Sequence, residues 1–400
     1  MAIAGQSGRI TNGTNLQREY RPPERRDSLR GPAASFLVAE DVLSRLLIGV
    51  PARNEAKNIV EVAQRIESGA KMLASSFDCR LALAYQTSDD DTLDRFTTRF
   101  GEMPQVVLQA PEPAVGKGAN VKLLIRHARE VNADFLLLVD ADFGDYDPCN
   151  VARTVDAADR HRHALVLPLW CRPRGQGNTT NYLASPLLLA THSARIRQPL
   201  AGHMLIHRSL FEQLDLDALP DDFGIDIMIT LTALAAGVSI GQIPLVAPEH
   251  PSKAGNSERV MVEVTTAVLP ALAALPAIGR PDVRLPDRYW DGWEWPPGGG
   301  AEPDHVDVIL RQARSEAQLE SWLRLAAADD DDVAETWCDH LAAAVRRIRA
   351  PHPDLGRIVD DLVCPFFAHA EHRARRGASV AELEQYVAEL GHRLAMRLHA

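Results

Sequence analysis

Cysteine is scarce in this chain of 400 residues, and no two cysteines stand close together. The five cysteines are Cys79, Cys149, Cys171, Cys338 and Cys364. Their scattered spacing argues against both a thiolate zinc site and a disulfide framework. Few, unpaired cysteines are typical of proteins in a reducing compartment, so we expect a cytoplasmic protein.

Long apolar runs and an excess of positive charge are also missing. The amino-terminal stretch MAIAGQSGRITNGTNLQ lacks the apolar core of a signal peptide. The most apolar segment, 260–278, is interrupted by Glu263, Pro270 and Pro276, so it predicts a packed helix and no membrane span. Lys and Arg number 43 against 54 Asp and Glu, a formal net charge of −11. A chain that repels phosphates overall is not expected to bind nucleic acid.

Short apolar segments alternate with helical patterns in the first two thirds of the chain. The expected strands are 46–51, 80–86, 105–109, 135–139, 164–169, 204–206 and 239–246. This alternation predicts an α/β fold with a mostly parallel sheet. Such sheets bind ligands at the carboxyl ends of their strands.

The composition divides the chain into four parts. Residues 1–34 predict a flexible tail, 35–280 the α/β domain, 281–300 a Trp-, Pro- and Gly-rich linker, and 301–400 a helical region. Helices are expected at 306–328, 333–349, 355–376 and 380–399, with Ser379 and Glu382 at capping-box spacing for the last.

Two features of the second half have a structural and a functional interpretation. The acidic run 329–332 predicts a solvated loop that starts a helix, with metal binding as the weaker alternative. Trp290, Trp293 and Trp295 indicate packing in preference to a platform on which a sugar stacks.

The most specific chemical feature is a pair of aspartates at the end of an expected strand. The segment 136–142, LLLVDAD, delivers Asp140 and Asp142 at the carboxyl edge of the sheet. Two carboxylates suit Mg²⁺ or Mn²⁺, which neutralises a diphosphate. The alternative is a plain acidic turn, and the context decides between the two.

Five further motifs lie at expected strand ends or helix starts. They are VPARNE at 50–55, GKG at 116–118, QPLAGH at 198–203, FGID at 223–226, and Glu249-His250 after the last expected strand. Together with the Asp-x-Asp pair they resemble, in the same order over residues 45–265, the GT-A nucleotide-sugar glycosyltransferases. The pattern is most similar to the retaining group around glucosyl-3-phosphoglycerate synthase and mannosylglycerate synthase.

This resemblance implies a site, position by position. The residues implied for the nucleotide sugar are Pro51, Ala52, Asn54, Glu55, Gln86, Ser88, Lys117, Asp140, Ala141, Leu200, Ala201 and Gly202. It implies Asp142, His250 and Asp140 for the metal. It implies Lys117, at the diphosphate, and Asp226, beside the acceptor hydroxyl, as the catalytic residues. Read alone, the structural interpretation is favoured for Asp226, as a helix N-terminal carboxylate, and for His250, as a loop histidine, and 200–202 has a tight turn as its alternative.

The chain departs from the resembled group around the acceptor. His203 stands where the group has glutamate, and Asn178 stands in the loop where the group has an arginine. The acceptor is expected to contact Gly177, Asn178, Thr179, Thr180, His203 and Asp226. These changes argue against a phosphorylated acceptor, unless Arg172 and Arg174 compensate.

The resemblance implies a metal-dependent hexosyltransferase that moves a sugar from a UDP- or GDP-sugar to a small hydroxylated acceptor with retention of configuration. The alternatives are a sugar-nucleotide nucleotidyltransferase, whose glycine-rich signature is missing after the first strand, and a non-catalytic assembly protein. The helical region is where a homo-oligomer contact is most easily placed.

Overall fold

The computed structural model describes residues 43–99, 101–110, 116–172, 175–248, 256–274, 282–285, 289–290, 293–294 and 305–399. All of them belong to one compact unit, Leu43–Ala400. The predicted tail 1–34 lies outside the described residues, as does most of the predicted linker 281–300. In the described part of the chain, no helix has the length and apolar content needed to cross a bilayer.

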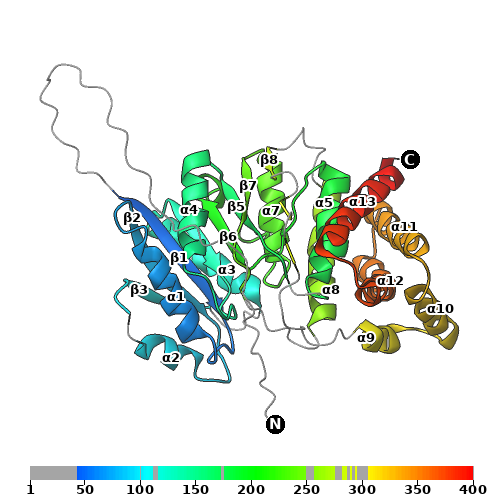
Figure 1. Cartoon of the computed structure of the whole chain (residues 1–400), viewed down its shortest axis with the longest axis horizontal. Coiled ribbons are helices and arrows are strands. Elements are labelled where there is room, and N and C mark those ends of the chain that lie inside the picture. Colours follow the sequence, from blue (N-terminus) through cyan, green and yellow to red (C-terminus); the bar gives the residue numbers. More distant parts are fainter. Residues whose placement is uncertain are drawn as a thin grey trace, which may run out of the picture. The chain divides into compact units, whose positions relative to one another are not determined.

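A mixed sheet of eight strands forms the centre of the fold (Figure 1). Its strands are β1 (Ser44–Ala52), β2 (Phe77–Tyr85), β3 (Gln105–Gln109), β4 (Phe135–Val139), β5 (Leu165–Leu169), β6 (His203–His207), β7 (Ile240–Pro244) and β8 (Val283–Arg284). Their order is β3-β2-β1-β4-β6-β5-β7-β8, and β6 alone runs antiparallel to its neighbours β4 and β5. The predicted mostly parallel α/β sheet is confirmed.

Helices connect and cover the strands. Those of the sheet region are α1 (Ile59–Lys71), α2 (Thr92–Thr98), α3 (Lys117–Glu130), α4 (Cys149–His161), the π-helical η1 (Thr179–Ala184), α5 (Ser185–His192), α6 (Arg208–Phe211), α7 (Ile225–Ala235) and α8 (Ser257–Ala274). The carboxyl-terminal helices are α9 (His305–Gln312), α10 (Glu316–Ala326), α11 (Asp330–Ile348), α12 (Leu355–Arg376) and α13 (Val380–His399).

Successive side chains along each strand point to opposite faces of the sheet, so the core forms two layers. In β1, Leu46 and Ile48 pack with α1 and α4 on one face, whereas Leu47 packs with α3 on the other. The second layer continues into the carboxyl-terminal helices. A Cβ on Gly49 of β1 would lie 2.8 Å from the methyl groups of Leu124 of α3, so this leucine would have to shift. The close approach of α3 brings its first turn to the end of β1.

Local sequence signals explain the starts of α10, α11 and α13. The Ser379–Glu382 capping box is formed, with the serine backbone N–H donating to the glutamate at 2.7 Å. Asp329 caps α11 by accepting from the backbone N–H of Asp332 at 3.0 Å, so the acidic run starts a helix as expected. The single helix expected at 306–328 is wrong, because Ser315 caps a new helix there and accepts from the N–H of Gln318.

The carboxyl-terminal helices pack on the sheet region of the same chain through α5 and α8 (Figure 1). A buried ion pair fixes this contact. Arg197, between α5 and β6, meets Glu384 of α13 at 2.7 Å, with 5% and 8% of the two side chains exposed. Tyr289 bonds both of them and stacks edge-to-face on Trp290 and Trp293. These two tryptophans therefore pack, as predicted, while Trp295 lies outside the described residues.

We expect Glu384→Ala to lower the free energy of unfolding by about 3–5 kcal/mol, because it leaves Arg197 charged and buried without its partner. Urea denaturation measures the loss. Glu389→Ala on the same helix is the control, since Glu389 is 53% exposed and its pair with Arg393 contributes at most about 1 kcal/mol. Equal losses in the two variants would contradict the buried role of Glu384.

Candidate active site

A cavity of about 620 Å³ opens at the carboxyl edge of the sheet. The loops after β1, β4 and β5 line it, together with the first turns of α3, α7 and α8. Because β6 is antiparallel to β4, its beginning lies at the same edge and adds Leu200 and Gly202. Helices α9 and α12 close the cavity with His305 and Phe366. The cavity thus joins the sheet to the carboxyl-terminal helices.

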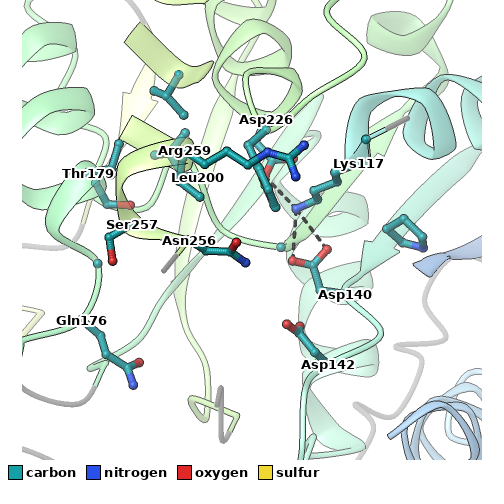
Figure 2. A pocket seen from close by; sticks show the side chains of 18 of the residues that line it. Lys117, Asp140, Asp142, Gln176, Thr179, Leu200, Asp226, Asn256, Ser257 and Arg259 are labelled. Carbon is teal, nitrogen blue, oxygen red and sulfur yellow. Dashed lines mark hydrogen bonds and ion pairs between the residues drawn. The ribbon is translucent and has the colours of Figure 1, made fainter. Parts of the chain in front are cut away.

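An ion network lines one side of this cavity (Figure 2). The Nζ atom of Lys117 lies 2.8 Å from Oδ2 of Asp226 and 3.0 Å from Oδ1 of Asp140. The three side chains are largely buried, with 12%, 6% and 20% exposed. Lys117 opens α3, Asp140 follows β4, and Asp226 lies in the first turn of α7. Three separate elements thus converge on one lysine.

The network holds more negative than positive charge. Burial raises the pKa of Asp140 to about 7, and the nearby carboxylates of Asp142 and Asp226 add to the effect of burial, against Lys117. Burial also raises the pKa of Asp226. Burial lowers the pKa of Lys117, but the two carboxylates outweigh it and raise that pKa overall. A cluster of carboxylates of this kind favours binding of a cation.

The loop that presents Lys117 is held by close backbone contacts. Gly116 has a φ of 132°, and a Cβ there would lie 2.3 Å from the carbonyl oxygen of Asp221. The side-chain amide of Gln86, at the end of β2, pairs with both the N–H and the carbonyl of Gly116. Asn120 donates to the carbonyl of Ala52 at 3.2 Å. These bonds tie the start of α3 to the ends of β1 and β2.

Gly202 makes room for the Asp140 carboxylate. The Asp140 backbone N–H donates to the Gly202 carbonyl at 2.8 Å, and a Cβ on Gly202 would lie 1.6 Å from Oδ2 of Asp140. No side chain fits there unless the carboxylate leaves Lys117.

We therefore expect Gly202→Ala to lower the unfolding free energy by about 1–3 kcal/mol through overpacking, and to reduce any activity of the site by displacing Asp140. Differential scanning calorimetry and a turnover assay measure the two effects. Gly356→Ala is the matched control, because its Cβ would meet only Asp354 at 3.7 Å. If the variants behave alike, the tight fit around Asp140 is wrong.

Asp142 directs its carboxylate into the cavity beside Asp140 (Figure 2). Mg²⁺ is typically bound by one or two protein carboxylates plus substrate phosphates, and this pair fits such a site. Within the described ranges, no group of three His, Cys, Asp or Glu side chains is placed to hold a metal by itself. His250, the third predicted ligand, lies outside the described residues.

Most residues predicted for the site do line this one cavity. Those are Pro51, Ala52, Asn54, Glu55, Gln86, Lys117, Asp140, Ala141, Asp142, Gly177, Asn178, Thr179, Thr180, Leu200, Gly202 and Asp226. The structure therefore brings together the ends of β1, β2 and β4, the 177–180 loop and the start of α7. Their proposed roles in binding remain predictions.

Three predicted residues do not reach the cavity. His203 is fully buried on the α4 side, where Nε2 lies 2.8 Å from Thr154 and Nδ1 lies 3.1 Å from the Tyr146 hydroxyl. Burial lowers the pKa of His203 to about 3, which keeps the ring neutral. His203 is the first residue of β6, and the alternation of side chains along the strand directs its ring away from the cavity. The predicted contact between His203 and the acceptor is therefore wrong. Ala201 is likewise buried, and Ser88 bonds the backbone of Asn54 instead of lining the cavity.

The predictions missed the residues that come from helices late in the chain. They are Asn256, Ser257, Arg259, Val260 and Val264 of the α8 region, His305 of α9 and Phe366 of α12. No motif marks them, because long-range packing alone brings them to the cavity. Arg172, weighed as a compensating cation, does line it.

Comparisons with known proteins find likeness in structure only. No family model matches the chain, and no curated protein is similar to it at a significant level. A glucosyl-3-phosphoglycerate synthase of Mycobacterium tuberculosis with Mn²⁺, UDP and phosphoglyceric acid is 19% identical, with a TM-score of 0.48 over 61% of this chain and 85% of that one. Its complex with UDP-glucose is 22% identical, with a TM-score of 0.47 over 61% and 86%. A mycobacterial protein is 24% identical, with a TM-score of 0.49 over 61% and 80%. These values mark a distant likeness in fold.

Proposed function

We propose that this chain is a metal-dependent glycosyltransferase that moves a sugar from a nucleoside-diphosphate sugar to a hydroxyl of a small acceptor. The observation that carries the proposal is Lys117, held between Asp140 and Asp226 and beside Asp142 at the carboxyl edge of the sheet. A cation and an adjacent carboxylate pair are what a metal-bound diphosphate needs. The cavity of about 620 Å³ lies within the size range of sites for small molecules.

The donor fits one end of the cavity. The nucleoside lies between the backbone of Pro51–Glu55 and the Gln86 amide, next to the first turn of α3. An ammonium group has three N–H donors, and Lys117 gives two of them to Asp140 and Asp226, which leaves the third for a phosphate oxygen. The N-terminus of α3 adds its dipole at the same place. We propose UDP or GDP as the nucleotide.

The leaving diphosphate gains charge as the sugar departs. Asp142 and Asp140 would hold Mn²⁺ or Mg²⁺, which would supply Lewis-acid stabilisation of that charge. Lys117 is pre-positioned by its two ion pairs, so it meets the developing charge without reorganising. Asp226, whose pKa is raised by burial, orients the acceptor hydroxyl and accepts its proton, while the hydroxyl oxygen bonds to the anomeric carbon and the bond from that carbon to the diphosphate breaks. Attack from the face that the diphosphate leaves gives retention.

Incubation of the full chain with Mn²⁺ and UDP- or GDP-sugars tests this function. Glycosyl transfer predicts slow release of nucleoside diphosphate without an acceptor and faster release with one. Pyrophosphate release from a sugar phosphate and a nucleoside triphosphate would instead identify a nucleotidyltransferase. If no nucleotide sugar is turned over or bound, the enzymatic proposal is wrong.

A further inference from the structure

The end of the cavity away from the ion network is built from uncharged side chains. In Figure 2, Gln176, Thr179 and Ser257 lie on the side opposite Asp140 and Asp142. Gly177, Asn178 and Thr180 of the same loop line the cavity too, with His305, which contacts Asn178, and with Val260, Val264 and Phe366. Amides and hydroxyls there both donate and accept hydrogen bonds, and the aliphatic and aromatic side chains supply apolar faces. We call these residues the neutral subsite.

His305 belongs to this subsite as a neutral imidazole. The Asn178 amide nitrogen lies 3.2 Å from the Gly175 carbonyl and 2.8 Å from Nε2 of His305. A carbonyl only accepts, so the amide nitrogen must face it, and Nε2 of His305 must then accept as well. The ring proton therefore lies on Nδ1, which is 3.4 Å from Glu371. The Asn178–His305 pair thus presents no positive charge to a ligand.

Besides Lys117, three described arginines line the cavity. Arg259 binds Glu263 at 2.6 Å, and its guanidinium extends toward Asp226 and Lys117 in Figure 2. Arg172 packs under Gly177 and interacts with Asp140, Asp142 and Asp226. Arg53 stands on the exposed loop after β1, three strands along the sheet from β5. An anion in the neutral subsite would lose its hydration, and the described arginines Arg172 and Arg259 already interact with carboxylates.

We propose that the neutral subsite binds the acceptor and that this acceptor is an uncharged polyhydroxyl molecule, a sugar or a polyol. The identification of this ligand as the acceptor rests on the proposed function. The chemical class of the ligand is inferred from the subsite itself. The carboxyl-terminal helices thereby take part in substrate choice, since α9 contributes His305 and α12 contributes Phe366.

Matched ligand pairs test the proposal without turnover. Saturation-transfer NMR titrations of the full chain with Mg²⁺ and UDP or GDP compare glucose with glucose 6-phosphate, mannose with mannose 6-phosphate, and glycerol with glycerol 3-phosphate. In at least one pair, the uncharged member is expected to bind at least about tenfold more tightly. Tighter or equal binding of the phosphorylated members throughout, or no binding by any uncharged member, overturns the proposal.

An added charge provides the second test. Asn178→Arg is expected to shift the affinity ratio by at least about tenfold toward the phosphorylated member. Gln385→Arg, an amide replaced by the same cation on the exposed face of α13, is the control and keeps the parent ratio. Equal ratios in both variants overturn the placement of the ligand beside Asn178. Hydrolysis of nucleotide sugars is measured separately, so failure of the proposed function is distinguished from failure of the subsite.

Discussion

Lys117→Met is expected to reduce kcat/KM for glycosyl transfer by about 10²–10³-fold, the range observed when a single pre-positioned group that stabilises developing charge is removed. Lys117 lies between Asp140 and Asp226 at 3.0 and 2.8 Å, so the substitution also leaves two buried carboxylates facing each other. The variant should therefore lose unfolding free energy as well, by about 3–5 kcal/mol. Steady-state kinetics and urea denaturation measure the two losses.

Lys122→Met on the same helix is the matched control. Lys122 also forms an ion pair, with Asp221, but that carboxylate is 56% exposed, so the pair contributes at most about 1 kcal/mol. A double variant tests the repulsion alone: Asp226→Asn added to Lys117→Met should restore stability. Turnover is read in Lys117→Met itself under conditions where it is folded, and full turnover there despite the lost stability would mean that Lys117 only supports the fold.

Asp142→Asn is expected to reduce turnover by roughly 10³-fold, because it removes a carboxylate that we assign to the metal, and Lewis-acid stabilisation is worth several kcal/mol. Asp142 is buried at 9% exposure and lines the cavity beside Asp140. The substitution keeps the shape of the side chain, so we expect little change in the thermal midpoint of the unliganded protein. Turnover at several Mn²⁺ concentrations measures the effect.

Asp145→Asn provides the comparison for Asp142. Asp145 lies three residues further on and pairs with Arg65 at 2.8 Å, with 62% of its side chain exposed. The backbone of Asp145 is left-handed, with a φ of 52°, and asparagine tolerates this conformation. A similar loss of turnover in both variants would show that turnover depends on negative charge anywhere near the carboxyl edge of the sheet. It would refute a specific role for Asp142.

The strand pattern of the first half could be predicted because it depends on local alternation. The segments 105–109 and 135–139 are observed with the expected bounds, since each is a short apolar run between turn residues. The direction of β6 could not be predicted, because it depends on which strands it joins. Ser315 was overlooked as a cap, and the expected helix at 306–328 is consequently two helices.

The site shows the same difference between features set by local sequence and features set by long-range packing. Residues at strand ends, such as Asp140 and Gln86, were predicted correctly to come together because parallel strands share a carboxyl edge. His203 was misplaced because the pattern did not show that β6 begins there and turns alternate side chains away. His305 and Phe366 escaped prediction because they reach the cavity only through the packing of α9 and α12.

The binding of nucleoside diphosphate tests the central claim most directly. Thermal unfolding of the full chain is followed with UDP and with GDP, each with and without Mn²⁺, for the parent and for Asp142→Ala. If the carboxylates at the sheet edge hold a metal that grips the diphosphate, one nucleotide raises the parent's midpoint only together with Mn²⁺, and Asp142→Ala abolishes that rise. An equal rise in the variant, or no rise in the parent with either nucleotide, would contradict the account.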